Sequence, residues 1–150
     1  ADVSAVMRDG PLTIAFMPPA STLMFYLPIG AGVRSIAEAA GARVITLAPT
    51  DGADTYGQAG MIQDVISQGV DAIIITTHDE NAAAPVLQRA VEAGIIVVLV
   101  NNDIPSFPTP IHAVVGYSQR AEMAKLGAWL SAKADGDVID IGSFRGSTPM

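Results

Sequence analysis

Cysteine is absent from this chain of 150 residues, so the chain can form no disulfide bond and carry out no thiolate chemistry. Basic side chains are scarce as well: 8 Lys and Arg stand against 15 Asp and Glu, which gives a formal net charge of −7. They are scattered singly, without the patch or stripe that neutralises phosphates. Nucleic acid and anionic membrane surfaces are therefore poor candidate partners.

Long hydrophobic runs are also missing. The longest apolar stretch covers residues 23–33 and contains Pro28 and two glycines, so it is too short to span a bilayer. Residues 1–4 lack the charged and apolar regions of a signal peptide, although such a start also fits a mature end left after cleavage. We therefore expect no direct membrane insertion.

The composition that remains is that of a folded globule. Half of the residues are hydrophobic and 15% are charged, a balance that disordered and fibrous chains do not have. A chain of this length is about one domain and can bury roughly two thirds of its unfolded surface. The sequence is therefore long enough for a self-sufficient core.

One pattern recurs along the chain: an amphipathic helix, a glycine, an apolar strand and a polar loop. Helices are expected over 20–40, 55–69, 82–93 and 119–134. Strands are expected over 12–17, 43–48, 71–76, 95–100, 111–116 and 137–141. Strands joined by helices of this length run parallel, with right-handed crossovers. The sequence thus predicts an α/β fold, a Rossmann-like open parallel sheet with helices on both faces and the order 2-1-3-4-5.

Two of the helices carry finer local signals. The first has apolar residues at spacings of three and four, which predicts a buried stripe made of Ile29, Val33, Ile36 and Ala37. The second opens on residues 55–58, Thr-Tyr-Gly-Gln, which have the Ser/Thr-x-x-Glu/Gln form of a capping box. A helix is therefore expected to begin at that box.

The strand over 95–100 has six consecutive apolar residues and stops abruptly at Asn101, Asn102 and Asp103. Such a strand suits the interior of a parallel sheet, where both faces are covered. Because ligands of open α/β sheets bind outside the carboxyl ends of the strands, these three residues are candidate ligand contacts. The alternative is that they only turn the chain before Pro105, since Asn and Asp are ordinary loop residues.

Polar and aromatic groups follow the other strands at the same edge. They are found in residues 18–26, 50–51, 76–79, 101–103 and 117–118. Amides and hydroxyls can bond vicinal hydroxyl groups, and aromatic rings can cover C–H faces, so this edge suits a neutral, polyhydroxylated ligand. Binding of that kind needs no reactive centre, and we predict no enzyme.

A dinucleotide cofactor is one alternative, because residues 30–35 imitate a Gly-rich fingerprint with Asp51 beyond it. The first strand ends at Met17, however, so Gly30 and Gly32 fall inside a helix and not at the strand-to-helix turn that binds pyrophosphate. Close helix packing explains them better. A Gly-Lys-Ser/Thr phosphate loop is also absent from the sequence, and we predict no cofactor.

A metal site was the second alternative. His78, Asp79 and Glu80 are consecutive and cannot converge without partners from elsewhere, and His112 has no second ligand at a suitable spacing. A helix N-terminus with Asp79 as its cap accounts for the first group. We predict no metal. A phosphoacceptor receiver domain is excluded as well, because residues 17–19, Met-Pro-Pro, stand where that chemistry needs carboxylates.

Several stretches together resemble a known family. They are residues 12–17 followed by Phe25-Tyr26, residues 63–75, residues 90–95 leading to Asn101-Asn102, and residues 115–118. As a set, over about residues 12–148, they resemble the type I periplasmic sugar-binding proteins, the ribose-binding-like group that serves ABC transporters. That group shares its lobes with the LacI-type repressors.

The resemblance implies a periplasmic, two-lobed protein that closes on a sugar or polyol and delivers it to an ABC permease. Position by position, Phe25 and Tyr26 look like rings that stack on the sugar, and Asn101 looks like the residue that takes its hydroxyls. Three further candidates are Thr22, where Asn is common, Asn102, where several members have Arg, and Ser118, which replaces a frequent hinge Asp. These departures leave the identity of the sugar open.

The resemblance also implies a domain division. Residues 1–11 are a lead-in, 12–118 an N-terminal ligand-binding lobe, and 119–150 the opening of a second lobe, so we expect a fragment whose missing C-terminal lobe would be a partner. Two rival functions remain: the effector domain of a LacI-type regulator, and a nucleotide-using flavodoxin-like enzyme. The regulator is disfavoured by the acidic charge and by the lack of a helix-turn-helix before residue 12.

Overall fold

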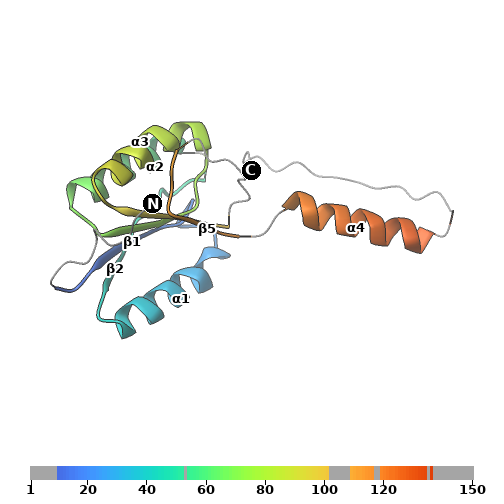
Figure 1. Cartoon of the computed structure of the whole chain (residues 1–150), viewed down its shortest axis with the longest axis horizontal. Helices are drawn as coiled ribbons and strands as arrows, with labels where there is room; N and C mark the ends of the chain where they lie inside the picture. Colours follow the sequence, from blue (N-terminus) through green and yellow to red (C-terminus); the bar gives the residue numbers. More distant parts are fainter. Residues whose placement is uncertain (1–9, 53, 102–108, 117–118, 135, 137–150) are drawn as a thin grey trace.

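The computed structural model has one open sheet of five parallel strands in the order β2-β1-β3-β4-β5 (Figure 1). The strands are β1 (Thr13–Met17), β2 (Arg43–Thr46), β3 (Ala72–Ile75), β4 (Ile96–Val100) and β5 (Ala113–Val115). The helices are α1 (Tyr26–Ala39), α2 (Thr55–Ser67), α3 (Glu80–Glu92) and α4 (Gln119–Ala134). The structure describes residues 10–52, 54–101, 109–116, 119–134 and 136. The predicted fold class and strand order are confirmed.

The main core lies between the sheet and the helix pair α2 and α3, which cover one of its faces (Figure 1). Successive strand residues point to opposite faces, so every second residue of the central strands enters this core. The fully buried strand members are Ala15, Met17, Ile73, Ile75, Val97 and Leu99, and the helices contribute Ile62, Val65, Leu87 and Ala90.

The opposite face is covered by α1, which packs against β1 and β2 (Figure 1). Here Phe16, Ala37 and Val44 form a second, smaller cluster. A Cβ atom at Gly30 would lie 2.8 Å from Cε1 of Phe16, so the helix approaches the sheet closely at that residue. A Cβ atom at Gly32 would meet nothing within 4 Å. Close packing therefore explains Gly30 but not Gly32.

The predicted stripe on α1 is wrong at one position, Ile36, which is 75% exposed. Ala37 is buried, and Ile29 and Val33 are half-buried. Because α1 packs on two strands at one side of the sheet, its covered stripe is narrower than apolar spacing alone suggests.

The predicted capping box at the start of α2 is also wrong. The N-cap is Asp54, whose Oδ1 accepts a hydrogen bond from the backbone N–H of Gly57 at 2.7 Å. Gln58, the expected partner within the box, is buried and bonds to the end of β3 instead. At α3 the prediction is confirmed: Asp79 is the N-cap, and its Oδ1 accepts from Ala82 N–H at 2.9 Å.

The last described helix, α4, has the predicted bounds and extends away from the sheet (Figure 1). Of the described residues, no helix is both long and apolar enough to cross a membrane. The expected lead-in before Gly10 and the expected strand over 137–141 lie outside the described residues. The division of the chain into a lobe over 12–118 and the opening of a second lobe remains a prediction.

Candidate functional site

Asn101 stands at the carboxyl edge of the sheet, directly after β4. Its backbone N–H donates to the carbonyl oxygen of Val115 at 2.8 Å, which ties it to the end of the neighbouring strand β5. Its φ angle is +55°, a left-handed conformation that Asn adopts more readily than most residues. This hydrogen bond and the φ angle thus fix the backbone position from which the Asn101 side chain projects.

The amide of Asn101 reaches the first residue of α1. Its Nδ2 donates to the hydroxyl of Tyr26 at 3.1 Å, and the rings of Tyr26 and Phe25 meet edge to face with centroids 5.2 Å apart. Tyr26 is 9% exposed, whereas Phe25 is 61% exposed. The structure therefore brings these three predicted residues together, with the Phe25 ring open to solvent.

The remaining predicted site residues stand differently. Thr22 is exposed at the same edge, and its Oγ1 donates to the carbonyl oxygen of Thr50 at 3.2 Å, in the loop after β2. Asn102 and Ser118, like Asp103, lie outside the described residues. Thr22 therefore joins two loops of the edge, and its hydroxyl has a backbone partner.

Sequence reasoning missed a buried polar network below this edge. Gln58 donates from Nε2 to the carbonyl oxygen of Thr76 at 2.9 Å and accepts the His78 N–H at 3.1 Å on Oε1. The His78 ring donates from Nε2 to the carbonyl oxygen of Pro19, and Thr76 Oγ1 donates to Val100 O at 2.7 Å. The network thus links the ends of β1, β3 and β4. The available signal is the polar run after the buried strand β3, although polarity alone favours an open cleft there.

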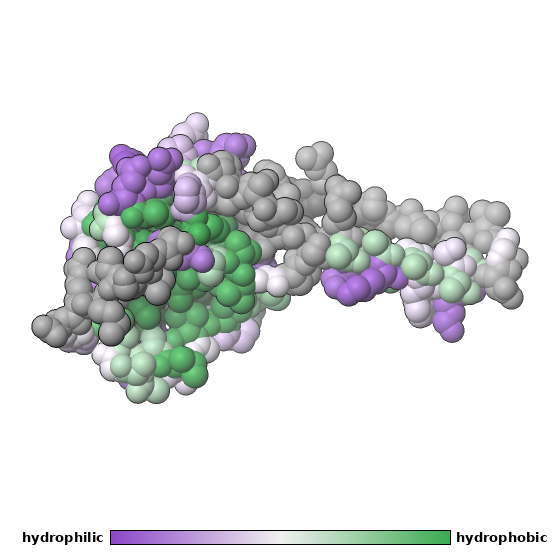
Figure 2. All heavy atoms as spheres, viewed as in Figure 1, coloured by the Kyte–Doolittle hydropathy of each residue, from purple (hydrophilic) through white to green (hydrophobic). Residues whose placement is uncertain are grey.

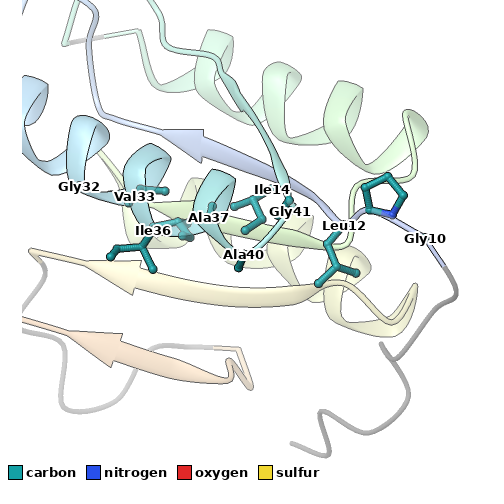
Figure 3. Close-up of a pocket in the computed structure, with 12 residues that line it drawn as sticks. Gly10, Leu12, Ile14, Gly32, Val33, Ile36, Ala37, Ala40 and Gly41 are labelled. Carbon is teal, nitrogen blue, oxygen red and sulfur yellow. The ribbon is translucent and has the colours of Figure 1, made fainter.

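An apolar groove of about 710 Å³ lies at the other end of the sheet, between β1 and the C-terminal half of α1 (Figure 3). It is lined by Gly10, Pro11, Leu12, Ile14, Gly32, Val33, Ile36, Ala37, Ala40, Gly41, Ala42 and Ile74. None of these side chains carries a hydrogen-bonding group, so the groove does not suit a hydroxyl-rich ligand. The polar carboxyl edge is therefore the better candidate site for such a ligand.

His112, the second histidine of the chain, belongs to the contact between β4 and β5. Its Nδ1 accepts the backbone N–H of Val97 at 3.0 Å, and burial lowers the pKa of the ring below its usual value. Within the described part of the chain, no three His, Asp or Glu side chains are grouped so that they could hold a metal ion.

Comparison with known proteins gives one family. A model of the periplasmic binding protein domain matches residues 14–149. Among curated proteins, the D-ribose/D-allose-binding protein of Pseudomonas aeruginosa is 40% identical over 52 residues, which are 35% of this chain and 16% of that protein.

Solved structures share the fold. An ABC transporter solute-binding protein from Burkholderia graminis, in complex with D-arabinose, superposes with a TM-score of 0.76 at 23% identity over 87% of this chain and 44% of that one. A Caulobacter myo-inositol binding protein bound to myo-inositol gives a TM-score of 0.73 at 20% identity over 85% and 42%. The chain thus spans less than half the length of these relatives.

Proposed function

The chain belongs to the periplasmic binding protein domain family, and we propose that it forms one wall of a sugar or polyol site in the substrate-binding component of an ABC importer. The function is binding without catalysis. The ligand is held between this lobe and a second one, which close about a hinge. A periplasmic location and an ABC permease as partner belong to the same proposal.

One observation carries the proposal: the hydrogen bond between Asn101 and Tyr26. It sets an amide beside a pair of aromatic rings at the carboxyl edge of a parallel sheet, where ligands of open α/β sheets bind. An amide offers two N–H donors and a carbonyl acceptor, which match the hydroxyls of a sugar, and an exposed ring covers its C–H face. The sugar D-arabinose and the polyol myo-inositol, which are bound in similar structures, support the same ligand class.

Phe25 also supports closure over the ligand. A ring that is 61% exposed at the edge of one lobe covers one side of a sugar, and the other side needs a second wall. A ligand shifts an open–closed equilibrium only by contacts that it makes better in the closed state. The proposed mechanism therefore needs both walls for tight binding.

The test uses the full-length gene product and a panel of D-ribose, D-allose, D-arabinose and myo-inositol, with affinities measured by calorimetry. We expect one panel member to bind, and we expect Phe25→Ala and Asn101→Gly each to weaken it about tenfold or more, or ~1.4 kcal/mol. Asn101→Gly removes the amide and still accommodates the positive φ angle.

The matched control is Ile36→Ala, which truncates an exposed apolar side chain of α1 in the groove at the other end of the sheet. Its affinity should equal that of the wild type. A nucleotide panel is run in parallel as thermal shifts, because any ligand that binds the folded form raises its melting temperature. Stabilisation by a nucleotide and by none of the sugars would overturn the proposal in favour of the flavodoxin-like alternative.

A further inference from the structure

The buried side chains of Gln58 and His78 connect the loops that carry the candidate sugar contacts. We infer that His78 is a positioning residue: it holds the loop between β1 and α1 so that the Phe25 ring is in place before the ligand arrives. This inference rests on the proposed function and adds to it a residue that does not touch the sugar.

Gln58 sets the direction of His78. Gln58 is 2% exposed, and its side chain forms two hydrogen bonds with the segment after β3. Its Nε2 donates to the carbonyl oxygen of Thr76 at 2.9 Å, and its Oε1 accepts the backbone N–H of His78 at 3.1 Å. A buried amide with both ends bonded has little freedom to move. The backbone from which the His78 ring projects is therefore fixed to α2.

The His78 ring, 3% exposed, then holds the start of the loop after β1. Its Nε2–H donates to the carbonyl oxygen of Pro19, while its Nδ1 finds no hydrogen-bond partner among the described residues. Pro18 and Pro19 have no backbone N–H, so this part of the loop can be bonded only through its carbonyl groups. The contact between His78 and Pro19 provides such an anchor.

Two further bonds hold the same loop from the other side. The N–H of Ser21 donates to Pro49 O at 2.9 Å, and Thr22 Oγ1 donates to Thr50 O at 3.2 Å. The loop after β2 also passes near the histidine, since a Cβ added at Gly52 would lie 3.4 Å from its Cε1 atom. The loop that ends at Phe25 is therefore fixed between its two neighbours, and a preformed ring avoids the entropy cost of ordering it on binding.

Two substitutions separate positioning from general stability. His78→Gln keeps an N–H donor near the position of Nε2, whereas His78→Asn places its donor one bond closer to the backbone and too far from Pro19. With the panel sugar that binds the wild type best, we expect His78→Asn to raise Kd about tenfold and His78→Gln to stay within about threefold. The stability control is Ile62→Val, a change in the main core at an apolar side chain that forms no hydrogen bond to this loop.

A second readout needs no sugar: hydrogen exchange at the amide of Ser21. If His78 positions the loop, exchange in His78→Asn should be about tenfold faster at Ser21 and unchanged at Val97, whose N–H is bonded far from this loop. Unchanged Ser21 exchange overturns the inference, and so does a loss of affinity in Ile62→Val as large as that in His78→Asn. If the wild type binds no panel sugar, the proposed function fails, and Ser21 exchange still decides whether His78 holds the loop.

Discussion

At the residue scale, His112 couples the protonation of one side chain to the pairing of two strands. Val97 N–H donates to its Nδ1, and the N–H of His112 donates back to Val97 O, each at 3.0 Å. A ring nitrogen that accepts a hydrogen bond must carry no proton, so this arrangement requires the neutral ring on that side. Burial acts in the same direction, because it disfavours the charged form and lowers the pKa.

Stability should therefore depend on pH through His112. Its folded-state pKa lies below the usual value of 6.5, so the unfolded chain binds this proton more tightly than the folded one does. The stabilisation is fully present above pH 6.5 and is lost as the pH falls through the folded-state pKa. Urea unfolding between pH 8 and pH 5 should show a shallower decline in His112→Gln than in the wild type, and equal slopes would contradict the prediction.

Residue types alone indicated part of the candidate site. Asn101 was predicted because polar residues stand where a parallel strand ends, whereas Phe25 and Tyr26 were singled out by the family resemblance. The structure brings the three together. Gln58 was misassigned because Thr55 and Gln58 have the spacing of a capping box. The Gln58 amide could cap the start of α2 or bond to Thr76 and His78 in the interior. Which of the two it does depends on where β3 lies in space.

At the element scale, the contact between α1 and β1 depends on one glycine. Phe16 is buried and cannot swing away, so Gly30→Ala should destabilise the fold by about 1–3 kcal/mol. Gly32→Ala in the same helix has open space and should stabilise it by about 0.5–1 kcal/mol through helix propensity. The measurement is the free energy of unfolding in urea, and a change of the same sign in both variants would contradict the packing argument.

The start of α2 offers a second matched pair. Asp54→Ala removes the acceptor for the Gly57 N–H and should cost about 1 kcal/mol of stability. Thr55→Ala removes the hydroxyl that the capping box would have used, and its effect should stay within about 0.5 kcal/mol. Thermal unfolding of both variants distinguishes the two possible caps. A larger loss of stability for Thr55→Ala than for Asp54→Ala would support the capping box instead.

The existence and order of the helices followed from their periodicity, whereas the extent of their buried faces did not. The apolar spacing on α1 predicts a stripe of residues that is buried against the sheet along its whole length. Because α1 packs mainly against β1 and β2, Ile36 lies outside the buried face, although Ala37 beside it is buried. The width of a covered face is decided by neighbouring elements, which a local pattern does not contain.

At the scale of the whole molecule, the two faces of the sheet are unequally covered. One face is covered by α2 and α3, and the other is covered by α1. Apolar surface between these elements is visible in the space-filling view (Figure 2). On that second face Ile74 and Val98 are only half-buried. The apolar groove beside α1 is part of this open face.

Replacing Ile36 tests how far this face behaves as exposed apolar surface. Ile36→Lys should change the unfolding free energy by less than about 0.5 kcal/mol, because the side chain is 75% exposed. It should lower the binding of a hydrophobic dye and any self-association of this chain. Leu27→Lys, also exposed on α1 but outside the groove, is the control, and an equal decrease in both variants would contradict a role of the groove.

The strand order has a consequence for synthesis of the chain. Among the described strands, β1 leaves the ribosome before the others, but it lies between β2 and β3, and Ile14 pairs with Ala72. β1 can therefore pair with β3 only after β3 has been synthesised, so a nascent chain stalled before β3 keeps one side of β1 unpaired. Ribosome-bound chains that end before Ala72 should be cut readily by protease, and resistance should appear only once β3 has emerged.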